Sequence, residues 1–365
     1  MAEQRSFLPR SEFPRLLSEL ATVGYRCIGP RVRDGAIVYE PIKGVEDFPR
    51  GIHDRQAPGE YRLEQTAEPR FFAWANGPQA LRPLTFAGRD KLWTAERGTD
   101  GSVEFTGEPP QAEPLAVIGV RACDLAALYV HDQHFMQTGH PDPWYTARRQ
   151  NLFLVAVNCT HPSLNCFCAS TGDGPRATYG YDLALSELDE GFLIEARSAK
   201  GERVLAGLPV REASAQQTET ADRDIESAAQ RQVKSVPSRN LRDVLFARLD
   251  HPRWNEVAQR CLSCTNCTLV CPTCFCHDET EVPSLDGRRS EHYREWGSCF
   301  TQSHSYIHGI TIRADTRTRY RQWLTHKVGS WHDQFGRSGC VGCGRCITWC
   351  PVGIDITEEL AAICR

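Results

Sequence analysis

The sequence carries little net charge and contains no long apolar run. Its 42 basic and 46 acidic side chains leave a formal net charge of -4 at pH 7, so it lacks the basic surface that nucleic-acid binding requires. No stretch approaches the ~20 consecutive apolar residues of a membrane-spanning helix. We therefore expect no nucleic-acid partner and no membrane span.

Several motifs of catalysis and nucleotide binding are missing as well. The sequence contains no GxGxxG loop, no GxxxxGK loop followed by serine or threonine, no GxSxG elbow and no HExxH pair. The glycine-rich segment 170–175 does not have the spacing of a phosphate-binding loop. We therefore expect neither a nucleotide or flavin site nor a hydrolytic centre of these types.

Cysteine, in contrast, is abundant, with 17 residues in a chain of 365. Residues 1–30 contain no twin arginine and no uninterrupted apolar core of an export signal, so we expect a cytoplasmic protein. Thiols in a reducing cytoplasm more often hold metal than form disulfides. The positions of the cysteines along the chain therefore matter most.

The first part of the chain has the pattern of an α/β domain. Residues 115–120 and 152–157 are compact apolar runs typical of buried strands, and residues 124–136 between them fit a helix with Asp124 at or near its N-cap. Strand, helix and strand in this order predict a parallel βαβ unit with a right-handed crossover. We therefore predict an α/β domain over residues 1–210.

The rest of the chain has a different pattern. Residues 211–240 are polar and poor in large apolar side chains, which is typical of a linker or an exposed helix. Residues 241–365 begin with an amphipathic helical pattern and contain few runs of the β type. We predict a mainly helical second domain over 241–365.

This second domain contains one cysteine motif twice. In each copy, four cysteines are separated by two, two and three residues and are followed by a proline, and the copies start 79 residues apart, at 261 and 340. The spacing is that of bacterial two-cluster ferredoxins, in which the fourth cysteine of each motif binds the other cluster. We predict two [4Fe-4S] clusters in a ferredoxin-type domain of the helical kind found inside larger redox enzymes. The predicted ligands of cluster 1 are Cys261, Cys264, Cys267 and Cys350, and those of cluster 2 are Cys340, Cys343, Cys346 and Cys271.

Zinc also binds four thiolates, but zinc sites seldom use two identical four-cysteine runs that each end in Cys-Pro, so iron-sulfur is favoured. Arg345 lies inside the second motif, where its charge is expected to favour the reduced and more negative cluster. Replacing it with a neutral residue should then lower the midpoint potential.

A further cysteine set lies in the predicted α/β domain. Cys123 and Cys159 directly follow the two predicted strands, and Cys166 and Cys168 lie on the loop after the second strand. Because the carboxyl ends of parallel strands meet at one edge of a sheet, these four thiols can converge on a third [4Fe-4S] cluster or a zinc ion. Asp124 is the alternative ligand if Cys123 points into the core. Ordinary packing of small buried cysteines is the competing interpretation.

Five cysteines stand outside these sets. Cys274, Cys276 and Cys299 are expected to belong to the thiol-rich wall of the first cluster rather than to bind metal. Cys27 and Cys364 are isolated and are expected to be structural.

Together these motifs resemble the beta subunit of cytoplasmic nickel-iron hydrogenases, the NADP-linked enzymes also called sulfhydrogenases or sulfur reductases. The resemblance covers roughly residues 115–365. The segments that carry it are 119–125 (GVRACDL), 145–149 (YTARR), 158–159 (NC), 165–168 (NCFC), 271–274 (CPTC) and 340–346 (CVGCGRC). The A subunit of anaerobic sulfite reductase shares much of this pattern.

The resemblance implies a heterotetramer. Its other members would be a gamma subunit that binds FAD and NAD(P), a small delta subunit with clusters, and an alpha subunit with the nickel-iron site. This chain would then be a non-catalytic electron-transfer subunit of an oxidoreductase, relaying electrons to or from the gamma subunit. One alternative is the A subunit of anaerobic sulfite reductase, and another is a subunit that itself reduces polysulfide at the N-terminal cysteine set.

Overall fold

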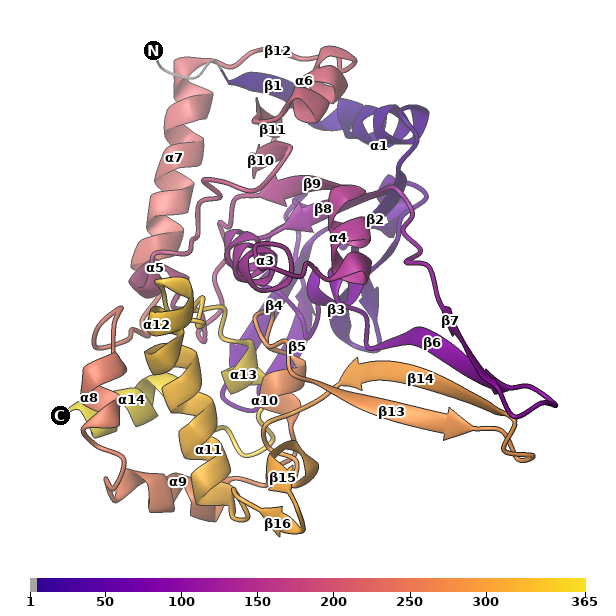
Figure 1. Ribbon diagram of the computed structural model, residues 1–365. Helices are drawn as coiled ribbons and strands as arrows, with labels where there is room; N and C mark the ends of the chain where they lie inside the picture. Colours follow the sequence, from indigo (N-terminus) through magenta and orange to yellow (C-terminus); the bar gives the residue numbers. More distant parts are fainter. Residues whose placement is uncertain (1–4) are drawn as a thin grey trace.

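The computed structural model describes residues 5–365, and its N-terminal half is built on a large mixed sheet (Figure 1). The strand order is β12-β1-β11-β10-β9-β8-β2-β3. Strands β2, β8, β9 and β10 run parallel to their neighbours in this group, and the outer strands are antiparallel. The eight strands are β1 (Ser6–Pro9), β2 (Arg26–Arg33), β3 (Ala36–Pro41), β8 (Leu115–Val120), β9 (Leu152–Val157), β10 (Leu183–Glu187), β11 (Gly191–Ala196) and β12 (Arg211–Glu212).

The predicted βαβ unit is present at the centre of this sheet. Strands β8 and β9 have the predicted bounds and pair in parallel. The helix between them, α3 (Ala122–Phe135), begins two residues earlier than predicted, with Arg121 at the N-cap. Asp124 therefore lies in the first turn of the helix, where a carboxylate also interacts favourably with the helix dipole.

Helices cover both faces of the sheet and bury its side chains. Helices α1 (Phe13–Thr22) and α6 (Ala199–Ala206) pack with one face, and α3 and α4 (Pro143–Gln150) pack with the other. Every residue of β9 is buried, which explains why its sequence is one continuous apolar run rather than an alternating one. The carboxyl ends of β8 and β9 are thereby held at one edge of a rigid core.

Residues 211–240, predicted as a linker or an exposed helix, contain the helix α7 (Ala215–Gln230). Ser214 and Gln217 form a capping box at its start, which satisfies backbone N–H groups of the first turn. Ala221, Ile225 and Ala228 are buried along one side, so α7 lies against the protein while its polar side faces solvent.

The C-terminal part contains short helices around its own apolar core. Trp254, Tyr320, Trp323 and Leu360 are buried in that core. The helices are α8 (Arg242–Phe246), α9 (Arg253–Arg260), α10 (Asn266–Leu269), α11 (Thr316–Thr325), α12 (Trp331–Phe335), α13 (Arg345–Thr348) and α14 (Ile356–Cys364). Within the described residues, no helix has the length and apolar character needed to cross a bilayer.

One feature of this part was not predicted. Between the two cysteine motifs, β13 (His277–Pro283) and β14 (Arg289–Trp296) form a long hairpin. Strand β14 pairs with β6 (Arg89–Arg97), which pairs with β7 (Val103–Gly107), and the four strands form an arm that projects from the body (Figure 1). The expectation of few β-type runs was wrong here because both strands of the hairpin are dominated by charged side chains and lack the apolar alternation that marks a half-buried strand.

The remaining elements are short. They are α2 (Arg82–Thr85), α5 (Cys168–Thr171), and the strand pairs β4 (Ile52–Ala57) with β5 (Glu60–Gln65) and β15 (Tyr306–Ile307) with β16 (Ile310–Thr311).

Candidate metal centre

The two cysteine motifs of the C-terminal part adopt the same local structure. In the first loop Ser263 and Thr265 have φ angles of 51° and 70°, and in the second loop Gly342 and Gly344 have φ angles of 64° and 74°. Each left-handed pair occupies the same two positions of its motif, and α10 and α13 begin at the next residue. A left-handed backbone costs a non-glycine residue roughly 1–2 kcal/mol, so Ser263 and Thr265 are both strained in the first loop. Such turns direct backbone N–H groups toward the enclosed cysteines.

The first predicted ligand set gathers around one cavity. Cys261, Cys264, Cys267 and Cys350 line this cavity together with Cys346, and the remaining wall contains no charged side chain. Two backbone N–H groups also point at the set: Ser263 donates to the Cys261 sulfur at 3.5 Å and Ile354 to the Cys350 sulfur at 3.3 Å. The structure therefore brings the fourth cysteine of the second motif to the first three of the first motif.

The second predicted set lies in the interior beside the first. Burial, with a smaller contribution from the neighbouring Cys343 and Cys271, raises the pKa of Cys340 to about 12. Cys346 is half-buried, and its partial burial together with Cys340, Cys343 and Cys271 raises its pKa as well. If these four neighbouring thiols lost their protons, the resulting thiolates would repel one another. A bound cation or cluster is therefore needed to balance their negative charge.

The donor set suits iron-sulfur clusters. Within the described residues, no three His, Cys, Asp or Glu side chains are drawn together as they would be around a single metal ion. A [4Fe-4S] cube is larger than one ion and is held by four thiolates placed around it, with N–H groups directed at the sulfurs. The cavity of the first set and the crosswise grouping of eight thiols are the features that such cubes need.

The N-terminal cysteines divide into a trio and a single residue. Burial, with a smaller contribution from Cys159, raises the pKa of Cys166 to about 12. Cys168 has both Cys166 and Cys159 as neighbours that raise its pKa. Cys123, near the start of α3, is buried in an apolar cluster with Cys168 and Cys343, so it lies between the trio and the second motif.

Asp124, the alternative ligand predicted for this set, has other partners in the structure. Its carboxylate is fully buried and lies 2.8 Å from the Arg345 guanidinium. It also accepts a hydrogen bond of 2.6 Å from the Asn76 amide. Asp124 thus acts as the counter-ion of Arg345, a role that sequence analysis missed.

The loop of the N-terminal trio is packed directly against the second motif. The Phe167 N–H donates to the Gly342 carbonyl at 2.8 Å, and the Asn165 amide donates to the Thr348 hydroxyl at 2.9 Å. A Cβ atom on Gly342 would lie 2.5 Å from the Cys168 nitrogen. Glycine is therefore required at this close approach, which joins the N-terminal set to the second ligand set.

Three cysteines outside the predicted sets gather near a lysine. Cys274, Cys276 and Cys299 each have the ammonium of Lys327 as a neighbour that lowers their pKa, although burial, and for Cys274 its contact with Cys271, outweighs this effect. Lys327 is itself buried, in the π-helical segment His326–Ser330 that follows α11. Sequence analysis did not single out Lys327, because this residue belongs to neither motif.

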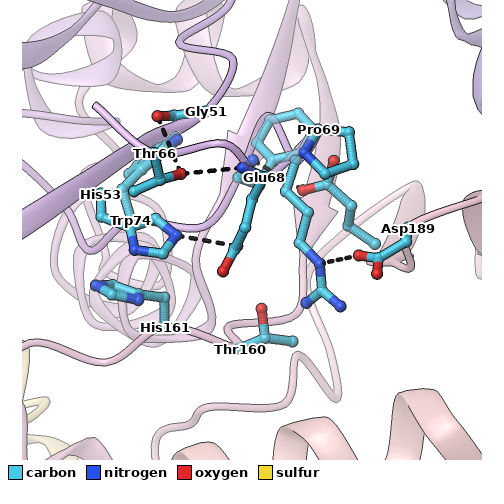
Figure 2. Close-up of polar contacts among 12 residues, drawn as sticks. Gly51, His53, Thr66, Glu68, Pro69, Trp74, Thr160, His161 and Asp189 are labelled. Atoms are coloured by element: carbon cyan, nitrogen blue, oxygen red, sulfur yellow. Dashed lines mark hydrogen bonds and ion pairs between the residues drawn. The ribbon is translucent and has the colours of Figure 1, made fainter. Parts of the chain in front are cut away.

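A polar cleft opens next to the N-terminal trio. Thr160 and His161, which directly follow Cys159, form part of its wall together with His53, Glu68 and other residues. Figure 2 shows His53 turned toward Glu68, with which it forms a 3.0 Å contact, and His161 beside it. The rings of His53 and His161 are 4.5 Å apart. The cleft gives solvent a route to the segment that carries Cys159.

Comparison with known proteins agrees with this geometry. Residues 260–354 match the family model of the 4Fe-4S dicluster domain. The chain is 28% identical over 353 residues to sulfhydrogenase 2 subunit beta of Pyrococcus furiosus, a match that covers 95% of this chain and 95% of that protein. The comparison with solved structures gave no match. The resemblance inferred from the motifs is therefore confirmed, and it extends over nearly the whole chain.

These similarities and the arrangement of the thiols support an iron-sulfur electron-transfer subunit. The dicluster match includes all eight cysteines of the two C-terminal sets.

Proposed function

We propose that this chain is the iron-sulfur subunit of a cytoplasmic multi-subunit hydrogenase of the sulfhydrogenase type and relays electrons to or from a partner subunit that binds FAD and NAD(P). The observation that carries the proposal is the crosswise convergence of the two C-terminal cysteine motifs, which places two four-thiol sets side by side. The full-length similarity to a sulfhydrogenase beta subunit supports the type of complex.

The ligand assignment follows from this arrangement. Cys261, Cys264, Cys267 and Cys350 would hold one [4Fe-4S] cluster, and Cys340, Cys343, Cys346 and Cys271 would hold the other. The clusters supply one-electron redox chemistry when bound. The chain itself would fix the spacing of the two sites, and it directs N–H groups of residues such as Ser263 and Ile354 at the sulfurs, which favours the reduced state.

The N-terminal trio would extend this relay. Cys159, Cys166 and Cys168, with Cys123 as the fourth thiol, would hold a third cluster. Two observations support it: the trio is grouped, and its loop is hydrogen-bonded to the loop of the second motif. Electrons could then pass in sequence from the first set through the second to the N-terminal set.

The proposal leaves bond chemistry to partner subunits. In the proposed complex these are a gamma subunit with FAD and NAD(P), a delta subunit with clusters and an alpha subunit with a nickel-iron site. The A subunit of anaerobic sulfite reductase is the alternative of the same class.

A second candidate function is polysulfide reduction by this chain at the N-terminal trio. The cleft beside Thr160 and His161 favours it, because it gives small molecules access to the segment of Cys159. This function would gain support if Arg121, two residues before Cys123, activated that thiol, but the structure does not favour such activation. Burial raises the pKa of Cys123 well above its ordinary value, and Arg121 donates instead to the carbonyls of Phe72 and Trp74 at 2.7 and 2.8 Å. Sulfide release by the purified chain that is lost in Cys159→Ser would establish this function.

The test of the main proposal is metal analysis of anaerobically purified protein together with EPR after dithionite reduction. We expect about eight irons and two interacting [4Fe-4S] signals, or about twelve irons if the N-terminal set also holds a cluster. Cys261→Ser should perturb one C-terminal signal, and Cys27→Ser, at an isolated buried cysteine, is the control that should leave the iron content unchanged. Zinc without an EPR signal would contradict the proposal.

A further inference from the structure

A buried lysine without a carboxylate partner lies beside the second cysteine set. Only 4% of Lys327 is exposed, and its ammonium donates a hydrogen bond of 2.8 Å to the Thr273 hydroxyl. The same hydroxyl lies 3.3 Å from the sulfur of Cys271, a predicted ligand of the second cluster. No ion pair between Lys327 and a carboxylate exists in the described part of the chain. Lys327 is thus held one hydroxyl away from a cluster ligand.

An unpaired ammonium in the interior is strongly unfavourable unless negative charge lies close by. The acidic groups around Lys327 are thiols. Although burial lowers the pKa of an ammonium, Cys271, Cys274 and Cys340 together raise the pKa of Lys327 above its ordinary value. The ring of Trp331, 4.5 Å from the ammonium, supplies a weaker attraction. The charge that can balance Lys327 is therefore that of the second cysteine set.

Arg345, which lies inside the second motif, differs from Lys327 in this respect. Its guanidinium is paired with the buried carboxylate of Asp124 at 2.8 Å. The two opposite charges are close together, so they partly offset each other at the second set, although Arg345 still lowers the pKa of Cys343 against the larger effect of burial. The sequence-based expectation that the charge of Arg345 favours the reduced cluster stays a prediction, and the structure adds Asp124 as its counter-ion.

Arg82 is a second buried cation on this side of the molecule, and its surroundings differ. Its guanidinium donates to the carbonyl oxygens of Thr268, Leu269 and Cys271 and lies 3.7 Å from the centre of the Trp296 ring. These contacts satisfy its N–H donors but do not remove its net charge, and Cys274 and Cys271 partly offset the lowering of its pKa by burial. Arg82 therefore adds to the positive charge near Cys271, whereas Lys327 has one hydrogen bond to an oxygen, the Thr273 hydroxyl that also contacts the Cys271 sulfur.

The first cysteine set has no comparable cation. No lysine, arginine or histidine lines its cavity. Cys264 of this set is exposed, and the neighbouring Leu262 is 63% exposed, so the first set lies near the surface. The two sets therefore have the same ligand chemistry but different electrostatic surroundings.

We propose that Lys327 raises the reduction potential of the second cluster above that of the first, so that transfer of electrons from the exposed first set to the second is energetically downhill. Reduction adds one electron and no proton to the second cluster, and the added negative charge is stabilised by the ammonium. One electron leaves the first cluster in the same step, so the transfer is balanced. This inference rests on the proposed function, because it requires both clusters.

The test is an EPR-monitored redox titration of the full-length protein with its clusters, comparing Lys327→Met, Lys327→Arg and Lys200→Met with the native chain. In Lys327→Met the ratio of reduced to oxidised second cluster at a given potential should fall at least tenfold, which corresponds to a lowering of the potential by about 59 mV for one electron. Lys327→Arg, which keeps the charge, should keep the potential close to that of the native chain. Lys200→Met removes an exposed lysine and should change nothing.

Unchanged potentials in Lys327→Met, with the iron content intact, would overturn the inference and leave the proposed function standing. Equal shifts in the Met and Arg variants would also overturn it, because packing rather than charge would then be the cause. If Lys327→Met does not hold its clusters, Cys264→Ser decides the order of potentials. The inference requires the substitution to perturb the signal of the cluster that is reduced last, and perturbation of the first-reduced signal contradicts it. Failure of the native chain to bind iron would instead refute the proposed function.

Discussion

At the scale of single residues, the buried pair of Arg345 and Asp124 shows how a motif residue can have a partner that the motif does not contain. Both side chains are 1% exposed or less, and they come from α13 and α3, in different halves of the chain. The guanidinium also donates to the Gly77 carbonyl at 3.1 Å. The pair is therefore a structural tie between the second motif and the N-terminal sheet.

Removing one member of this pair should destabilise the fold strongly. We expect Arg345→Met to lower the free energy of unfolding by about 3–5 kcal/mol, because the carboxylate of Asp124 would remain buried without its partner. The double variant Arg345→Met, Asp124→Asn should recover most of the loss, since no unpaired charge remains. Urea denaturation of these two variants, of the single variant Asp124→Asn and of the native chain measures this coupling.

A matched control is the pair of Arg5 and Asp222, of which Asp222 is 35% exposed. Asp222→Asn should change the free energy of unfolding by no more than about 1 kcal/mol. If Arg345→Met were no more costly than this control, Asp124 would not depend on Arg345 for its charge balance.

Sequence reasoning identified the residues whose chemistry is local. The eight C-terminal cysteines could be assigned because each cluster motif is fixed by a spacing of a few residues. Lys327 and the partner of Arg345 could not be found, because their significance depends on contacts between segments far apart in the chain. The spacing of a motif identifies ligands, but the charges around a cluster come from the tertiary structure.

At the scale of elements, the backbone of the second-motif loop is in direct contact with the backbone of the loop that carries the N-terminal trio. Gly342 is needed for its positive φ of 64° and also for the absence of a Cβ, which would lie 2.5 Å from the Cys168 nitrogen. Gly336, after α12, has a similar φ of 67° but nothing within 4 Å of a Cβ. Substitution of the two glycines therefore distinguishes the cost of a left-handed backbone from the cost of a steric clash.

Gly336→Ala should cost about 1 kcal/mol of stability, from the left-handed backbone alone. Gly342→Ala should cost clearly more, and it should weaken the contact between the N-terminal trio and the second set, because one loop must move. Thermal unfolding measures the first effect, and reactivity of Cys166 and Cys168 toward a thiol reagent in metal-free protein measures the second. Equal costs for the two variants would show that the loops separate easily.

The secondary structure could be predicted where the apolar residues of an element follow one clear pattern along the sequence. Strands β8 and β9 are fully or largely buried and appear in the sequence as apolar runs with clear ends. The hairpin of β13 and β14 was missed because its strands pair through the backbone in an exposed arm, and their side chains are mostly polar or charged. Strands that are held mainly by backbone hydrogen bonds in an exposed arm need no regular spacing of apolar residues, so their sequence lacks that signal.

At the scale of the whole molecule, the division at residues 211–240 into two domains remains a prediction, and the structure shows several ties across it. Arg82, in the N-terminal half, donates to the carbonyls of Thr268, Leu269 and Cys271 beside the first motif. Strand β6 pairs with β14 along seven residues of each strand. The loop of the N-terminal trio is bonded to the second motif.

Because the first and third of these ties are largely buried and involve the cluster-binding loops, we expect the full chain with its clusters to unfold in one cooperative transition. Circular dichroism, which reports on all elements, and absorbance of the clusters, which reports on the C-terminal part, should then give the same midpoint. Arg82→Met removes three hydrogen bonds across the boundary and should separate the two midpoints, whereas Arg15→Met, at an exposed residue of α1, should not. If the native chain already shows two midpoints, the N-terminal sheet folds independently and the N-terminal trio cannot depend on the second motif for its position.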